Sequence, residues 1–148
     1  MKAENKKKLI HTSIIIIIIF FLDRLSKIYI VSLAKINNSL DIFVTKYLNI
    51  YLIWNEGIAF GLLSFNQNSI YNTITALIAI ISIVVLVLII KTHDVRFYFY
   101  SFIFGGATGN LFDRIYYSAV PDFIDLHINS YHWFIFNVAD IFITIGVL

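Results

Sequence analysis

Two aspartates, Asp122 and Asp140, lie in strongly apolar surroundings and could perform acid–base chemistry together. Asp122 lies in a short apolar loop, and Asp140 lies inside the last hydrophobic segment. A carboxylate at membrane depth is costly and marks a candidate functional site. Of two close carboxylates, one keeps its proton while the other is ionised. Such a pair could activate water and protonate a leaving group.

Two further pairs of charged residues accompany the aspartates. Asp23 and Lys27 are four positions apart, so they share one face of a helix. The alternative interpretation is a simple ion pair near the membrane interface, with the lysine stem reaching toward the headgroups. Arg114 offers a planar fork suited to a carboxylate, and we expect its neighbour Asp113 to hold that fork.

A glycine-rich segment precedes these last two residues. Gly105 and Gly109 form a G-x-x-x-G pair, a spacing that lets two helices approach closely. Gly106, Asn110 and Arg114 fall at i, i+4 and i+8. This spacing predicts a polar stripe on one helical face, which is unsuited to contact with lipid.

A metal site is conceivable near Asp125, His127 and His132. However, the spacing of these residues matches no recognised metal-ligand motif. We therefore predict that they are solvent-exposed loop residues and that the protein needs no metal. Asn55, in contrast, begins a turn that leads into a helix start.

The composition excludes several classes of protein. Of the 148 residues, 59% are hydrophobic and 14% are charged, whereas soluble proteins are about 25% charged. A net charge of +2 excludes a strongly basic nucleic-acid binder. Because there is no cysteine, disulfides, thiolate nucleophiles and cysteine-based metal sites are also excluded.

The hydrophobic segments predict an all-α membrane protein with four transmembrane helices in a single domain. Residues 70–90 carry no charge and have the length of about 20 residues that spans a bilayer. The other three helices are expected at residues 9–34, 97–114 and 133–148.

The loop between the first two helices, residues 35–69, shows apolar alternation that predicts a small β-sheet. The four lysines near the N-terminus place that end in the cytoplasm, since basic residues accumulate on the inner side. The loop is then extracytoplasmic. The polar groups of the helices fall toward the same outer leaflet, which predicts one site at the outer membrane boundary.

Five motifs occur in order: Asp23…Lys27, Asn55-x-Gly57-x-Ala59-Phe60, Gly106-x-x-x-Asn110-x-x-Asp113-Arg114, Val120-x-Asp122-Phe123 and Phe136-Asn137-x-Ala139-Asp140. Together they resemble the lipoprotein signal peptidase family, also called signal peptidase II. The resemblance extends from the first helix to Gly146. The sequence departs from the family pattern at Leu148, where the usual basic tail is lacking.

The resemblance implies a four-helix aspartic endopeptidase of the bacterial inner membrane with an extracytoplasmic β-cradle. Such an enzyme removes the signal peptide from prolipoproteins, cutting before a diacylglyceryl-modified cysteine. Asp122 and Asp140 correspond to the catalytic aspartates. The supporting polar residues correspond to Asn55, Asn110, Arg114, Asn137, Asp23, Lys27 and Asp113. The expected partners are lipidated prolipoproteins and membrane lipid, with no cofactor, metal or nucleic acid, and the protein is expected to be a monomer.

Two other classes of protein compete with this interpretation. A small proton- or ion-coupled transporter would use Asp23, Asp140 and Arg114 as a relay. It predicts polar groups in both leaflets, whereas the inner halves of the second and third helices have none. A non-catalytic membrane scaffold would use polar residues only to join helices. It does not explain an aspartate in each of two adjacent outer segments.

Overall fold

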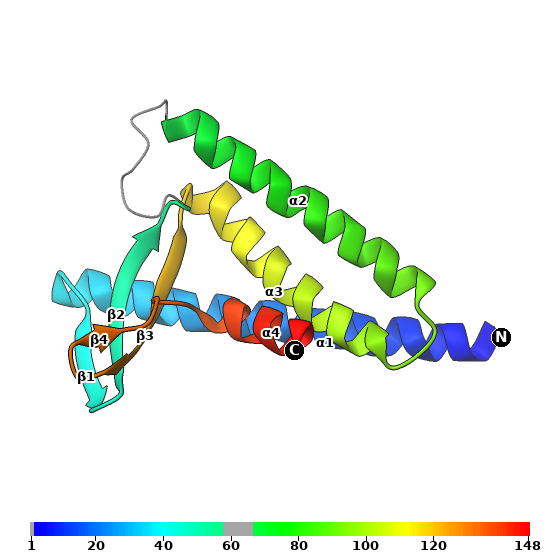
Figure 1. The fold of residues 1–148 in the computed structure, drawn as a ribbon, viewed down its shortest axis with the longest axis horizontal. Coiled ribbons are helices and arrows are strands. Elements are labelled where there is room, and N and C mark those ends of the chain that lie inside the picture. Colours follow the sequence, from blue (N-terminus) through cyan, green and yellow to red (C-terminus); the bar gives the residue numbers. More distant parts are fainter. Residues whose placement is uncertain (1, 58–66) are drawn as a thin grey trace.

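A computed structural model describes residues 2–57 and 67–148. Within these ranges the helices are α1 (Lys2–Asn37), α2 (Gln67–Lys91), α3 (Arg96–Tyr117) and α4 (Val138–Val147). Helix α3 contacts the other three helices. Figure 1 shows α1 running along the length of the molecule, with the sheet at the end opposite the N-terminus and α4 against α1 and α3.

The sheet is antiparallel, with strand order β1-β2-β3-β4. Its strands are β1 (Asp41–Thr45), β2 (Leu48–Asn55), β3 (Val120–Ile128) and β4 (Tyr131–His132). The sheet predicted in the first loop is confirmed for β1 and β2. Confining it to that loop was wrong, because β3 and β4 come from the segment between α3 and α4. Asp122 therefore lies in a strand and not in a loop.

The register between β2 and β3 shifts where β2 faces Asp122. Ile50 pairs with Ile124 and Ile53 pairs with Asp122, so the spacing between the two pairs differs on the two strands. Such irregularities bend a strand and redirect side chains, and they are common beside active sites. This feature accompanies the inward placement of Asp122, which is 2% exposed.

Helix α4 begins five residues later than the predicted start at position 133. Asn137 caps the helix by accepting a hydrogen bond from the backbone N–H of Asp140. Just before it, Phe136 forms a bridge with Ile124 of β3. The chain ahead of position 138 is thus held by the sheet, and the cap at Asn137 fixes where the helix starts.

One described helix, Ser69–Lys91, is long and apolar enough by length and composition to cross a membrane. Helix α4 is apolar but has 10 residues, a length of about 15 Å, against about 30 Å for the hydrocarbon core. The arrangement with four transmembrane helices stays a prediction.

The glycines of α3 allow close helix packing, as the G-x-x-x-G spacing predicted. A Cβ atom at Gly105 would lie 3.0 Å from the side chain of Ile19 on α1. At Gly109 it would lie 2.6 Å from the carboxylate of Asp23. Gly106 faces α4 and belongs to the same close packing, rather than to a polar stripe alone.

We expect Gly106→Ala to destabilise the fold more than Gly105→Ala. A Cβ at Gly106 would lie 2.5 Å from the backbone oxygen of Ala139, which cannot move without shifting α4. Overpacking of this kind costs about 1–3 kcal/mol. At Gly105 the nearest atom is the Cβ of Ile19 at 3.0 Å, so the overlap is smaller and a shift of a few tenths of an ångström relieves it. Thermal unfolding in detergent should give a lower midpoint temperature for Gly106→Ala than for Gly105→Ala. The reverse order would contradict this account of the packing between α3 and α4.

Candidate active site

The structure brings the two predicted catalytic aspartates to one place from β3 and α4. Asp122 accepts hydrogen bonds from the side-chain amides of Asn55, at 2.8 Å, and Asn137, at 2.6 Å. Asp140 accepts one from the backbone N–H of Asn137 at 3.0 Å. Asn137 therefore lies between the two carboxyl groups and bonds to both.

A second asparagine, Asn110, connects Asp140 to the helices. Its side-chain N–H donates to Asp140 at 2.8 Å, while its side-chain oxygen accepts from Lys27 at 2.8 Å. Since an amide offers both donors and an acceptor, this one side chain holds an acid and a cation in fixed positions. The predicted supporting residues Asn55, Asn110 and Asn137 each contact at least one of the two aspartates.

Burial raises the pKa of Asp122 to about 6 from an ordinary value of 3.8. The hydrogen bonds from Asn55 and Asn137 oppose this rise, and the nearby charge of Asp140 adds to it. A carboxyl group with a pKa close to neutrality can both hold and release a proton at physiological pH. This is the property needed for acid–base work.

We expect the free energy of unfolding to fall as pH rises through about 6. A group whose pKa is raised in the folded state stabilises the fold fully below its unfolded pKa, and this contribution is lost above the folded value. A rise from 3.8 to about 6 corresponds to about 3 kcal/mol, at 1.36 kcal/mol per pKa unit. Denaturant unfolding at pH 4 and pH 7.5 measures the change. The Asp122→Asn variant should show a smaller difference in unfolding free energy between the two pH values. An equally large difference in that variant would contradict the attribution of the pH dependence to Asp122.

Lys27 holds α1 to α3 from within the protein. Its ammonium group donates to Asp23 at 2.9 Å, to Asn110 at 2.8 Å and to Asp113 at 2.6 Å. Asp23 and Lys27 share one face of α1, as predicted, and they form the ion pair of the alternative interpretation. The other part of that alternative, a lysine stem reaching toward headgroups, is wrong because the Lys27 side chain is 1% exposed.

Asp113 does not hold the Arg114 fork, and this expectation was wrong. Its carboxylate pairs with Lys27 and with Arg24, a residue that the sequence analysis did not select. Consecutive residues on a helix point about 100° apart, so Asp113 and Arg114 face different neighbours. The signal that could have indicated Arg24 was a second cation next to Asp23, directly after the apolar run of the helix.

Arg114 lies instead beside the turn that follows β2. A Cβ atom at Gly57 would lie 2.9 Å from the guanidinium nitrogens, and Gly57 has a φ of +77°. Glycine has no Cβ atom and readily adopts a positive φ, so it fits this position better than any other residue. The guanidinium also lies over the ring of Tyr71, at 5.4 Å from its centroid, a contact that the sequence did not reveal. Ala59 and Phe60, the rest of that motif, lie outside the described residues.

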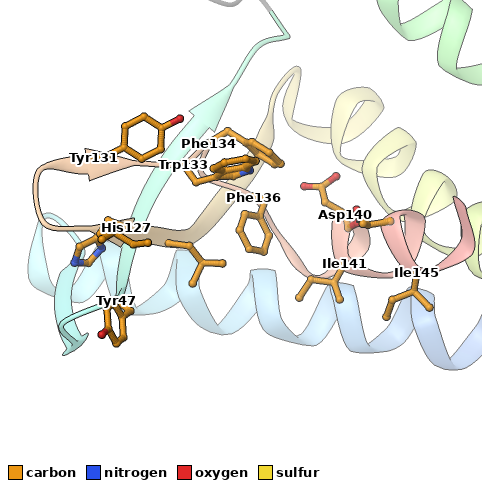
Figure 2. Close-up of a pocket in the computed structure, with 12 residues that line it drawn as sticks. Tyr47, His127, Tyr131, Trp133, Phe134, Phe136, Asp140, Ile141 and Ile145 are labelled. Atoms are coloured by element: carbon orange, nitrogen blue, oxygen red, sulfur yellow. Dashed lines mark hydrogen bonds between the residues drawn. The ribbon is translucent and has the colours of Figure 1, made fainter. Parts of the chain in front are cut away.

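An apolar cavity of about 630 Å³ adjoins Asp140. Figure 2 shows Asp140 at one end of it with Ile141 and Ile145, and Tyr131 and His127 toward the other. The cavity is lined by Tyr47, Leu126, His127, Ile128, Tyr131, Trp133, Phe134, Phe136, Asp140, Ile141, Thr144 and Ile145. Its size suits a small ligand or part of a larger one, and its walls favour apolar groups.

Asp125, His127 and His132 lie in strands β3 and β4 and not in a loop, so that part of the expectation was wrong. Asp125 is buried at 4% exposure, whereas His132 is solvent-exposed as predicted. Their side chains gather at one point of the hairpin, away from the Asn137-linked aspartates. The sequence showed their types but not the strand pairing that unites them.

Comparison with known proteins gives consistent results across the chain. The family model for Signal peptidase (SPase) II matches residues 15–148. A lipoprotein signal peptidase of Pelagibacter ubique is 52% identical over 147 residues, covering 99% of this chain and 89% of that one. One from Anaplasma phagocytophilum is 43% identical over 139 residues, covering 91% and 85% of the two chains.

Two solved structures of bacterial membrane enzymes, both determined by the in meso method, share the fold. One is 31% identical with a TM-score of 0.72 and covers 93% of this chain and 87% of that one. The other is 29% identical with a TM-score of 0.68 and covers 93% and 82%.

Proposed function

We propose, because this chain belongs to the signal peptidase II family, that it works as an aspartic endopeptidase with Asp122 and Asp140 as its catalytic pair. The protein is a bacterial membrane enzyme that removes signal peptides from prolipoproteins. We propose that the signal peptide is cut by acid–base chemistry of these two carboxyl groups. The observation that carries it is the link through Asn137, which bonds to both carboxyl groups.

The proposed reaction uses the two carboxyl groups in opposite protonation states. The ionised group takes a proton from a water molecule as that water attacks the scissile carbonyl carbon. The protonated group donates its proton to the carbonyl oxygen. The newly protonated group then gives its proton to the leaving amine as the C–N bond breaks. The other group takes a proton back from a hydroxyl of the tetrahedral intermediate, which restores both starting states. This chemistry requires no metal and no covalent intermediate.

The neighbouring polar residues support positioning roles in this proposal. The side-chain amides of Asn55 and Asn137 donate to Asp122 and that of Asn110 donates to Asp140, so hydrogen bonds restrain both acids. Lys27 donates a hydrogen bond to the side-chain oxygen of Asn110 and so holds that side chain in place. We assign Arg114, beside the turn at Gly57, to contact with the substrate backbone.

The proposed substrate is a diacylglyceryl-modified prolipoprotein that enters from the lipid. The apolar cavity beside Asp140 offers a place for acyl chains or for apolar residues of the signal peptide. Exposed apolar side chains cover α1 and α2, including Ile17, Phe21, Leu77 and Ile83. This supports helices that face lipid in a multi-pass protein. The four lysines near the N-terminus support a cytoplasmic N-terminus, and the sheet at the opposite end of α1 then lies toward the outer leaflet.

Incubation of the purified protein in detergent with a diacylglyceryl-modified prolipoprotein tests this proposal. Mass measurement should show a product that begins at the lipidated cysteine. The same prolipoprotein without the lipid is the matched control and should remain uncut. Cleavage of both substrates at equal rates would contradict recognition of the lipid, while leaving the aspartic chemistry to be judged by the variants described below.

We expect cleavage to continue in EDTA. Every proposed bond-making step is carried by carboxyl groups, so chelation removes nothing that the reaction needs. The measurement is the initial cleavage rate of chelator-treated protein against untreated protein. If EDTA abolished cleavage and zinc restored it, cleavage would depend on a metal ion, contrary to this expectation.

A further inference from the structure

We propose that Asp125, His127 and His132 form a binding site for a divalent transition-metal ion of the zinc class, distinct from the two aspartates assigned to catalysis. One carboxylate oxygen and one nitrogen from each imidazole all lie within 4.8 Å of one another. The three residues come from the hairpin of β3 and β4. The ion would stabilise the β3–β4 hairpin and would take no part in peptide-bond cleavage.

The strand pairing places these ligands together before any ion binds. His127 and His132 are directly opposite each other in the register of β3 and β4. Their rings stack with centroids 5.0 Å apart. Asp125 precedes His127 by two residues, and residues two apart on a strand share one face. The backbone therefore presents all three side chains on the same side of the hairpin.

The distances between ligand atoms suit a tetrahedral ion. Asp125 Oδ2 lies 3.0 Å from His132 Nδ1 and 3.7 Å from His127 Nδ1. With zinc–ligand bonds of about 2.0–2.2 Å, two ligand atoms of a tetrahedral site are about 3.3 Å apart. The two distances fall on either side of this value, so small side-chain movements would bring the atoms into range.

The hydrogen bonding of His127 gives independent support. Its side chain is 9% exposed, and Nδ1 is buried without a hydrogen-bond partner among the residues that the structure describes. A buried polar atom that lacks a partner is destabilising and calls for an explanation. Coordination of an ion would satisfy this nitrogen and would also balance the buried charge of Asp125.

The chemistry of the ligands selects the ion. Two imidazoles and one carboxylate form a donor set suited to zinc, with water as the fourth ligand. Calcium and magnesium prefer oxygen donors, so they fit poorly. His127 also lines the apolar cavity, and Trp133 of its wall follows His132 directly. An ion here would fasten the hairpin that carries part of that wall.

Calorimetric titration with zinc chloride tests the proposal on the full-length, chelator-stripped protein in detergent, without a polyhistidine tag. One ion should bind per chain. His127→Ala and His132→Ala should each weaken binding by more than about 100-fold, the upper limit for losing an outer-sphere partner of a metal site. His93→Ala, which removes an exposed histidine elsewhere, is the matched control and should bind as the unaltered protein does.

A second measurement on the unaltered protein keeps the test independent of variant folding. Cobalt(II) should produce the visible absorption of a four-coordinate site, and zinc should displace it. Absence of stoichiometric binding, or full binding by His127→Ala, would overturn the proposal and leave an ordinary His132–Asp125 hydrogen bond. Because no substrate is present, this result is independent of whether the protein cuts as an aspartic peptidase.

Discussion

Asp122→Asn and Asp140→Asn, made separately, are each expected to lower the cleavage rate by about 10²–10⁴-fold or more. Asparagine keeps the size of aspartate but can neither accept nor return a proton, and general acid–base catalysis contributes a factor of this size. Because the two groups act as one unit, the double variant should be little slower than either single variant. Rates are measured by mass spectrometry of a lipidated prolipoprotein.

Neither variant should unfold the protein. At position 122, asparagine has one acceptor oxygen for the two amides that donate to it, so one hydrogen bond is lost. Removal of a buried charge offsets this loss. Asp41→Asn, at an exposed aspartate of β1, is the matched control and should cut normally. Near-normal cleavage by Asp122→Asn or Asp140→Asn would show that the protein is not an aspartic peptidase.

Lys27→Met is expected to destabilise the fold by about 3–5 kcal/mol, the usual cost of removing one partner of a buried ion pair. The change leaves the carboxylates of Asp23 and Asp113 buried with fewer compensating charges, and both are 0% exposed. Denaturant unfolding in detergent measures the loss. A second change, Asp23→Asn, should recover part of it, because it removes one charge while keeping an acceptor for the Ala139 N–H.

Arg96→Met provides the comparison for an exposed ion pair. Arg96 and Asp94 lie 2.6 Å apart, with side chains 68% and 51% exposed. Exposed pairs contribute about 0–1 kcal/mol, so this variant should unfold almost as the unaltered protein does. If Lys27→Met were as mild as Arg96→Met, the buried charges around Lys27 would not be important for stability.

The sequence predicted local elements well and non-local pairing poorly. Residues 70–90 were expected to be helical and fall within α2, because an uncharged run of that length has few alternatives. Apolar alternation correctly predicted β1 and β2. It did not predict that Leu48–Asn55 would pair with Val120–Ile128, more than 60 residues away, because nothing in a local pattern specifies a distant partner strand.

The same limit applies to the candidate site. Apolar surroundings selected Asp122 and Asp140, and the family resemblance added the three asparagines, which the structure brings beside them. Adjacency in sequence paired Asp113 with Arg114, whereas helix packing turns Asp113 toward Lys27 and Arg24. The role of Tyr71 beside Arg114 also depends on how α2 lies against α3, which the sequence alone does not determine.

The hydrogen bonds at the start of α4 allow hydrogen exchange of two backbone amides to measure how often the candidate site opens. The first amides of a helix normally lack partners within it. Here the Ala139 N–H donates to Asp23 and the Asp140 N–H donates to Asn137. Deuterium can replace these two hydrogens only when the surrounding side chains separate. Their exchange rates therefore give the free energy of opening the site directly, without substrate or inhibitor.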